Sequence, residues 1–265
     1  MRDITDILEE WPYDSDSSVR KITGDDGREL LQVRTPLGIE QYELSGRPDG
    51  ARPYGSESVL EHVEAERRAH IDAFGDTDEF EIDAGMASEL QQEGLVYYYR
   101  YLVCFQVGEY EIVAQDTRRN LRMFDLMRAH CRDEEVVNGS EQYRPYVLRM
   151  NAAAEALQAV GRGEHDRARA MIQRTLDAID RLPDVPTATF DYEKERSLAI
   201  LRGMRKAIPE APPATQEERL ERELARVVNE EDYERAAEIR DQLRQLTARR
   251  GPAPSRAPES TSNDE

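Results

Sequence analysis

Lysine is nearly absent from this chain, and basic residues as a whole are outnumbered. Lys21, Lys194 and Lys206 are its only lysines beside 33 arginines, and these 36 basic residues face 55 acidic ones, so the formal net charge is −19. Proteins that bind DNA or RNA neutralise the phosphate backbone with Lys and Arg. We therefore expect no direct contact with nucleic acid.

Long hydrophobic runs are absent as well. The most apolar stretch, 95–107, is interrupted by Arg100 and is shorter than the roughly 20 residues that a membrane-spanning helix needs. The acidic N-terminus lacks the hydrophobic segment of a secretory signal. The two cysteines, Cys104 and Cys131, lie far apart in apolar helical patterns, which favours free thiols in a reducing compartment over a disulfide. We expect a soluble cytoplasmic protein that does not bind a membrane.

Motifs for catalysis and metal binding are also missing. The four histidines, His62, His70, His130 and His165, are scattered along the chain. The spacings Cys-x-x-Cys and His-Glu-x-x-His and the phosphate-binding loop Gly-x-x-x-x-Gly-Lys do not occur. We therefore predict no enzymatic activity, no metal and no cofactor. The alternative, an enzyme whose pocket is assembled from distant residues of the helical region, stays open.

The first 55 residues have the pattern of a small antiparallel sheet. A short helix at 2–10 precedes three apolar runs at 19–22, 30–34 and 39–44. The first two runs are separated by an Asp-Gly turn, which is a strong hairpin signal. We expect residues 1–55 to form a β unit that packs on the helices that follow.

Residues 56–208 predict a body of successive helices. Ser56 is expected to cap a helix at 57–74, a loop follows at 75–83, and the last helix spans 192–207. We therefore predict a mainly α protein with a small N-terminal antiparallel β unit.

Two helical hairpins in this body echo each other at an offset of 55 residues. The first turns at Gly108 and the second at Gly163. Apolar residues match at the same offset: Leu102 and Leu157, Val113 and Ala168, Phe124 and Ile179. The second hairpin, 152–183, resembles a tetratricopeptide repeat in its Gly-Glu-x-Asp-x-Ala turn and its closing Leu-Pro. The offset exceeds the 34 residues of that repeat, so we do not expect a regular superhelix.

Four tyrosines gather in the first of these helices: Tyr97, Tyr98, Tyr99 and Tyr101. Side chains at these positions point around the whole helix, so they cannot all lie in the core. One interpretation is a peptide-binding groove lined by Tyr97, Tyr98 and Tyr101. The interpretation that we favour is a core that packs against the N-terminal sheet.

A prolyl linker at 209–214 separates the body from a segment, 215–248, with the pattern of two helices. Its first apolar stripe has the spacing i, i+4, i+7, i+8 and consists of Leu220, Leu224, Val227 and Val228. Its second stripe alternates by three and four residues and consists of Ala236, Ile239, Leu243 and Leu246. Asp232 is placed to cap the second helix. Folded back as a hairpin, the two stripes meet.

So short a pair of helices buries little apolar area, and we expect it to seek a further helix. Tyr233 and Ala237, beside Arg240, form a second apolar edge for that contact. The alternative is a solvated hairpin that packs on its own body.

The second helix carries the run Asp232-Tyr233-Glu234-x-Ala236-Ala237-x-x-Arg240-Asp241-x-Leu243-x-x-Leu246, preceded by Leu220 and Leu224. This run resembles the UVR motif, which closes the excision-repair helicase subunit UvrB and recurs in its nuclease partner UvrC. The resemblance implies an antiparallel helical hairpin that associates with another UVR hairpin. The partner-binding residues that it implies are Leu220, Leu224, Val228, Tyr233, Ala236, Ala237, Arg240, Asp241, Leu243 and Leu246.

The whole arrangement resembles a group of bacterial proteins that contain the UvrB/UvrC motif, with a disordered tail expected at 249–265. We predict a non-enzymatic adaptor that docks on a UVR-bearing partner or on a second copy of itself. Two alternatives stay open. One is an accessory factor of nucleotide excision repair that binds UvrB or UvrC, and the other is the enzyme with an unrecognised site.

Overall fold

The computed structural model describes residues 3–209, 220, 223–224, 227–228 and 232–250. Contacts along the chain divide it into two compact units, 1–209 and 210–265, and each is described by itself. The predicted fold class is confirmed, because the described chain is mainly helical with a three-stranded antiparallel sheet near the N-terminus. The predicted linker beyond Pro209 and the predicted tail beyond Arg250 lie outside the described residues.

The N-terminal sheet forms as the alternation of apolar residues predicts. After helix α1 (Thr5–Glu10), strands β1 (Val19–Thr23), β2 (Glu29–Thr35) and β3 (Gly38–Glu43) pair antiparallel in the order β1-β2-β3. Leu31 lies opposite Lys21 on one side and Tyr42 on the other. Leu31 and Tyr42 are buried, so one face of the sheet supplies apolar side chains to the core.

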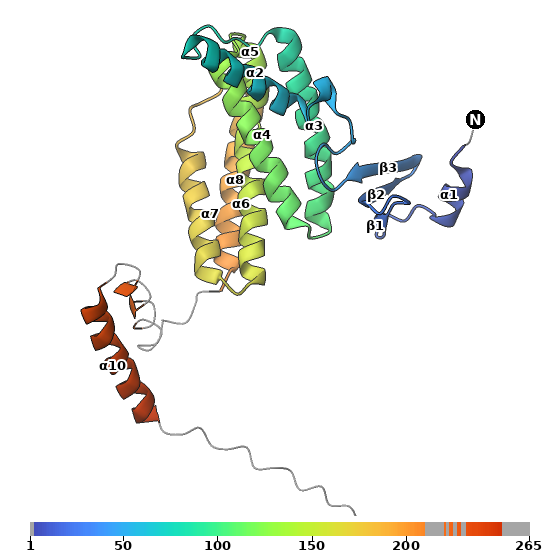
Figure 1. The fold of residues 1–265 in the computed structure, drawn as a ribbon. Coiled ribbons are helices and arrows are strands. Elements are labelled where there is room, and N and C mark those ends of the chain that lie inside the picture. Colours follow the sequence, from blue (N-terminus) through green and yellow to red (C-terminus); the bar gives the residue numbers. More distant parts are fainter. Residues whose placement is uncertain (1–2, 210–219, 221–222, 225–226, 229–231, 251–265) are drawn as a thin grey trace, which may run out of the picture. The chain divides into compact units, whose positions relative to one another are not determined.

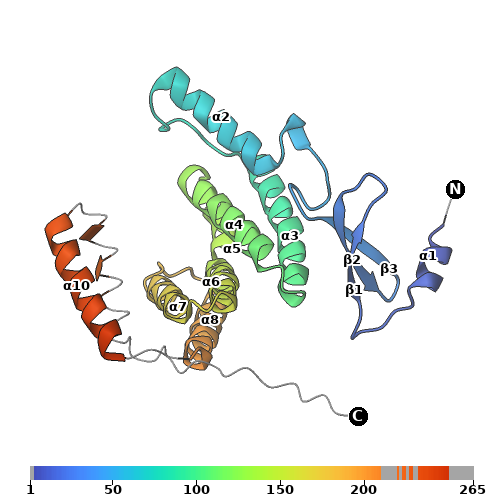
Figure 2. The ribbon, with the colours of Figure 1, turned by 60° about the horizontal axis from the view of Figure 1, so that its bottom comes forward.

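Most long helices of the first unit lie side by side, and its first long helix crosses one end of them (Figures 1 and 2). After a short 3-10 turn at Pro53–Gly55, its helices are α2 (Val59–Phe74), α3 (Ala84–Gln106), α4 (Tyr110–His130), α5 (Glu134–Glu141), α6 (Arg144–Gly161), α7 (His165–Asp180) and α8 (Ala188–Ala207). Helix α4 packs on α3 and α6, while α7 and α8 both pack on α6. No helix in the described part of the chain is long and apolar enough to cross a membrane.

Two helix starts differ from the sequence prediction. Ser58, not Ser56, caps α2, because its side chain accepts the backbone N–H of Glu61 at 3.1 Å. Helix α8 begins at Ala188, four residues before the predicted start, because the Thr187 side chain accepts an N–H of its first turn. In both cases the helix begins after a residue with extended backbone whose hydroxyl accepts a backbone N–H. Other polar residues lie close to each start, so the sequence alone does not decide which of them is the cap.

The turns of the two echoing hairpins have the same geometry. Gly108 and Gly163 take φ values of +82° and +75°, a conformation that side chains rarely adopt. In each turn the N–H after the glycine donates to the carbonyl five residues earlier, at 2.9 and 2.8 Å. The echo at 55 residues is therefore a structural one, while the likeness to a tetratricopeptide repeat stays a prediction.

The sheet and the helices share one part of the core. Leu31 and Tyr42 pack into a cluster of buried residues from α3, α4 and α6: Tyr101, Cys104, Val113, Ala114, Met150 and Ala154. The sheet thus shields apolar side chains of α3, α4 and α6 from water, and it completes this part of the core.

Candidate functional site

The C-terminal unit contains the segment with the most specific sequence signal. Helix α10 spans Tyr233–Arg250, and the described residues 220, 223–224 and 227–228 before it are also helical (Figure 1). The predicted cap forms, because Asp232 Oδ1 accepts the backbone N–H of Arg235 at 3.1 Å. This bond satisfies one of the free N–H groups at the start of α10.

The two helical stretches of this unit run antiparallel. The N–H of Asp232 donates to the carbonyl of Val227 at 2.9 Å, across the turn. Further from the turn, Arg235 Nη2 lies 3.3 Å from Glu223 Oε1. Residues later in the second stretch therefore pair with residues earlier in the first, as in an antiparallel hairpin.

The hairpin has an apolar interior of its own. Its fully buried residues are Leu220, Val227, Ala236 and Ile239, with Leu224, Leu243 and Leu246 partly buried against them. Five of the ten residues predicted to bind a partner therefore lie between the two helices. Leu220 and Ala236 are buried there, whereas Leu224, Leu243 and Leu246 keep part of their surface exposed.

The remaining five predicted residues lie on the outside. Tyr233 is 67% exposed and Val228 is 39% exposed, while Ala237, Arg240 and Asp241 are also exposed. Tyr233, Ala237 and Arg240 have the spacing i, i+4, i+7, so they form one stripe along α10. We call Tyr233, Ala237 and Arg240 the outer stripe, and its role in partner binding stays a prediction.

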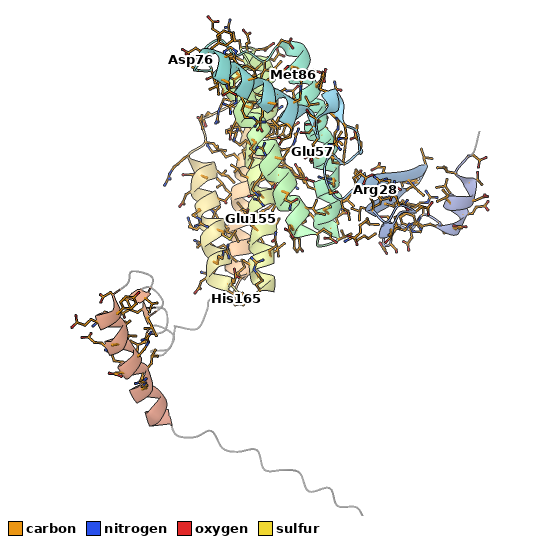
Figure 3. The ribbon with its side chains drawn as sticks, in the orientation of Figure 1. Arg28, Glu57, Asp76, Met86, Glu155 and His165 are labelled. Carbon is orange, nitrogen blue, oxygen red and sulfur yellow. The ribbon has the colours of Figure 1, made fainter. Side chains whose placement is uncertain are left out.

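Three histidines of the first unit, His62, His70 and His130, make aromatic contacts. His62 stacks on Tyr54 with ring centroids 4.2 Å apart, and His130 meets Phe80 edge-on at 5.1 Å. His165 is the first residue of α7 (Figure 3). Among the described residues, no group of three or more His, Cys, Asp or Glu side chains could hold a metal ion.

A buried charge cluster lies between α2, α3 and α4. Glu93 is 1% exposed and accepts the backbone N–H groups of Val59 and Leu60 at 2.7 and 3.2 Å. Its carboxylate also pairs with Arg119, and Arg47 Nη1 lies 3.2 Å away. Burial lowers the pKa of Arg119, yet a guanidinium beside a carboxylate stays charged.

This cluster has a structural explanation. The Glu93 carboxylate caps the N-terminus of α2, and its charge is balanced by two arginines. The sequence carries a signal for this cluster: Leu90, Glu93 and Tyr97 share one face of α3, and a glutamate between two buried residues needs a partner.

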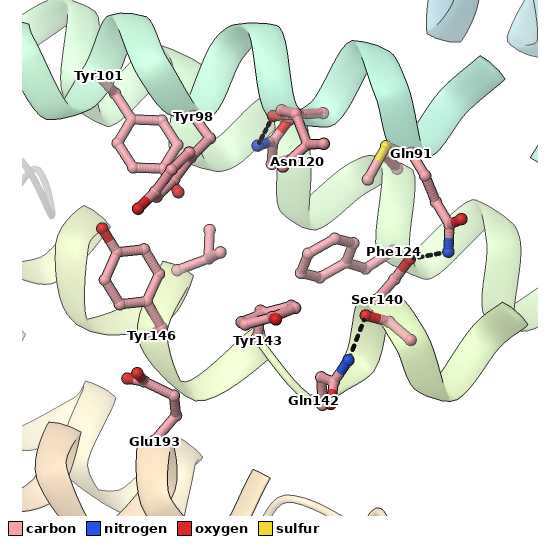
Figure 4. A pocket seen from close by; sticks show the side chains of 15 residues that line it. Gln91, Tyr98, Tyr101, Asn120, Phe124, Ser140, Gln142, Tyr143, Tyr146 and Glu193 are labelled. Atoms are coloured by element: carbon pink, nitrogen blue, oxygen red, sulfur yellow. Dashed lines mark hydrogen bonds between the residues drawn. The ribbon is translucent and has the colours of Figure 1, made fainter. Parts of the chain in front are cut away.

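The first unit also contains a cavity of about 570 Å³ between α3, α4, α6 and α8 (Figure 4). Tyr98 and Tyr101 lie in its lining, together with Phe124, Tyr146 and Glu193. Burial raises the pKa of the Tyr101 and Tyr146 phenols far above its usual value. The Tyr101 and Tyr146 phenols are therefore neutral hydrogen-bonding groups near neutral pH.

Tyr97 is not among the residues that line this cavity. Its ring is buried and lies against the guanidinium groups of Arg100 and Arg119, at 5.2 and 4.4 Å. The fourth tyrosine, Tyr99, is 52% exposed. Only Tyr98 and Tyr101 of the predicted groove residues therefore face one cavity.

Sequence reasoning missed the other half of the cavity lining. Tyr146 comes from the first turn of α6, Tyr143 immediately precedes that helix, and Glu193 comes from α8. No local pattern joins them to the tyrosines of α3, because the helical stacking alone brings these segments together.

Comparison with known proteins identifies the C-terminal segment. The family model of the UvrB/uvrC motif, UVR, matches residues 218–248. The predicted UVR resemblance is confirmed for this segment, and the motif is one that mediates protein interactions. No curated protein and no solved structure matches the chain.

Proposed function

We propose that this protein is a non-enzymatic adaptor whose C-terminal hairpin binds another UVR hairpin, on a partner protein or on a second copy of the chain. The observation that carries the proposal is the outer stripe. Tyr233 keeps 67% of its surface exposed although Ala236 and Ile239 of the same helix are fully buried. An exposed aromatic beside a small residue is typical of a surface that another helix can approach closely.

The composition of the stripe fits a helical partner. Ala237 leaves room for a neighbouring backbone, Tyr233 supplies apolar area, and Arg240 and Asp241 offer charges of both signs at the edge. The net charge of the chain is −19, and residues 215–250 and 251–265 each contribute −2. Residues 1–214 therefore carry the remaining −15. A protein partner with arginines therefore suits this chain better than a nucleic acid. The cytoplasmic location stays a prediction.

The test uses two variants of the full chain. In Tyr233→Ala combined with Ala237→Gln, the aromatic is removed and the close approach is blocked without a change to the hairpin interior. Gln242→Ala is the matched control, because Gln242 is exposed on the other flank of α10. Self-association is measured by analytical ultracentrifugation, and partner capture by pull-down from the lysate of the native host with mass spectrometry.

We expect the double variant to lose the association that the unchanged chain and Gln242→Ala both show. Capture of a UVR-bearing protein by those two alone would support the proposal, and its identity would separate an excision-repair role from other roles. If the double variant associates as the unchanged chain does, the outer stripe is not the binding surface.

A further inference from the structure

The cavity of the first unit has a lining of two kinds. One end is aromatic: the ring of Tyr98 lies 5.4 Å from Tyr101 and 6.0 Å from Tyr146, measured between centroids. The volume of about 570 Å³ falls in the range of small-molecule sites. Tyr143 and Leu95 line its rim and are 46% and 53% exposed, so the cavity is open to solvent.

The other feature is one carboxylate oxygen, Glu193 Oε2, which has an ion-pair partner but no hydrogen-bond donor among the described residues. Glu193 lines the cavity from α8 and points toward Tyr146 (Figure 4). Its Oε2 is buried and accepts no hydrogen bond from the part of the chain that the structure describes. Arg149 Nη2 forms an ion pair with this oxygen at 3.7 Å, a separation too long for a hydrogen bond. A hydrogen bond donated to such a buried acceptor is favourable, because the acceptor would otherwise stay unsatisfied.

We propose that the cavity binds a small organic cation, an amine or amidine on an aromatic or apolar body. Its charged group would donate to the carboxylate of Glu193, whose side chain is 13% exposed, and its body would lie against the rings of Tyr98, Tyr101 and Tyr146. The faces of phenol rings attract cations, and the charge of −15 on residues 1–214 raises the local concentration of cations around this unit.

An anion is the less suitable occupant. Arg149 Nη1 is also buried without a hydrogen-bond partner among the described residues. Arg149 does not line the cavity, however, whereas Glu193 does. An anionic ligand would therefore meet the carboxylate before it met the guanidinium.

The test compares two probes that differ in charge. p-Aminobenzamidine carries an amidinium group, and 4-aminobenzamide is its neutral counterpart of nearly the same shape. Binding of each probe to the full chain is followed by probe fluorescence and by ligand-observed NMR. We expect the cation to bind at least about tenfold more tightly, because a charge-assisted hydrogen bond forms only with the amidinium.

Two charge variants locate the contact. Glu193→Gln keeps the size of the side chain and removes its charge, and we expect p-aminobenzamidine to bind it about tenfold more weakly or worse. Glu195→Gln makes the same change at an exposed position of α8 and serves as the matched control. We expect Glu195→Gln to bind the probe as the unchanged chain does.

A third variant covers the case in which Glu193→Gln does not fold. Leu95→Trp fills the rim of the cavity from a position that is 53% exposed, so the fold should tolerate it. We expect this variant to lose probe binding. Equal binding of the two probes, equal binding by the two glutamate variants, unchanged binding by Leu95→Trp, or no saturable binding by the unchanged chain would each overturn the proposal.

Discussion

Arg100 and Asp116 form a buried ion pair that is joined at two points. Arg100 Nε and Nη2 lie 2.8 and 2.6 Å from the two carboxylate oxygens of Asp116. The remaining nitrogen, Nη1, donates to the carbonyl oxygens of Glu43 and Gly46 at 2.8 and 2.9 Å. One guanidinium thus links α3 to α4 and to the loop that follows the sheet.

Asp116→Ala should destabilise the first unit strongly. The substitution leaves the Arg100 charge buried without its partner, and breaking such a pair costs about 3–5 kcal/mol. Denaturant unfolding followed by circular dichroism measures the loss. Arg167→Ala is the control, because Arg167 is 63% exposed in its pair with Glu164 and should contribute less than about 1 kcal/mol. Equal losses in the two variants would contradict the role assigned to Asp116.

Glu93→Gln should loosen the start of α2. A neutral amide cannot balance Arg119 and Arg47, and its NH₂ group opposes the N–H groups of Val59 and Leu60. We expect a loss of about 3 kcal/mol and faster hydrogen exchange at the amides of Val59 and Leu60. Ser58→Ala removes only the neighbouring cap and should cost about 1 kcal/mol. Unchanged exchange at both amides in Glu93→Gln would show that the carboxylate does not cap α2.

The two thiols should differ in reactivity. Cys104 is fully buried and Cys131 is partly buried. Burial raises the pKa of the Cys104 thiol to about 12, so the reactive thiolate is scarce at pH 8. In a thiol titration of the folded protein, Cys131 should react first, and Cys104 should react only after denaturant is added. The variant Cys131→Ser identifies the fast thiol, and rapid labelling of that variant would contradict the burial of Cys104.

Stability should fall in alkaline solution. Burial raises the pKa of Tyr97 to about 12, as it does for Cys104. A group with a raised pKa in the folded state binds its proton more tightly there than in the unfolded chain. Its contribution is complete below the unfolded pKa and is lost as pH rises through the interval from about 9–10 to about 12. We expect the free energy of unfolding to be about 3 kcal/mol lower at pH 10.5 than at pH 8. Equal values at the two pH values would contradict this.

The inside and the outside of the hairpin should respond differently to truncation. Ile239 is fully buried in the hairpin interior, whereas Tyr233 is exposed. Ile239→Ala should cost about 2 kcal/mol or more, enough to increase hydrogen exchange along α10. Tyr233→Ala should leave that exchange unchanged while it weakens association. The same exchange pattern in both variants would mean that the outer stripe supports the hairpin itself.

The sequence predicted those features that depend on neighbours along the chain. The alternation of apolar residues predicts β1, β2 and β3 within a residue or two, and the position of Asp232 predicts the cap that its bond to Arg235 forms. It did not predict that Val227 is 2% exposed while Val228 is 39% exposed. Adjacent residues on a helix point about 100° apart, so the side that faces the partner helix decides which of the two is buried.

The cavity was beyond the reach of sequence patterns for a related reason. Tyr98 and Tyr101 could be marked as candidates because tyrosines cluster there. Tyr146 and Glu193 come from segments about 45 and 90 residues further along, and they meet the first two only because α6 and α8 stack as they do. Side chains that are joined by packing alone leave no fixed spacing to read.

The contacts of Arg100 with Glu43 and Gly46 bear on any attempt to shorten this protein. If the chain were cut after the sheet, one buried guanidinium nitrogen would lose both of its acceptors, and Glu93 would lose the contact with Arg47. The apolar surface that Leu31 and Tyr42 cover would open to water at the same time. A helical fragment starting near residue 56 would therefore contain buried charged groups without these partners. The sheet and the loop after it are an integral part of the first unit.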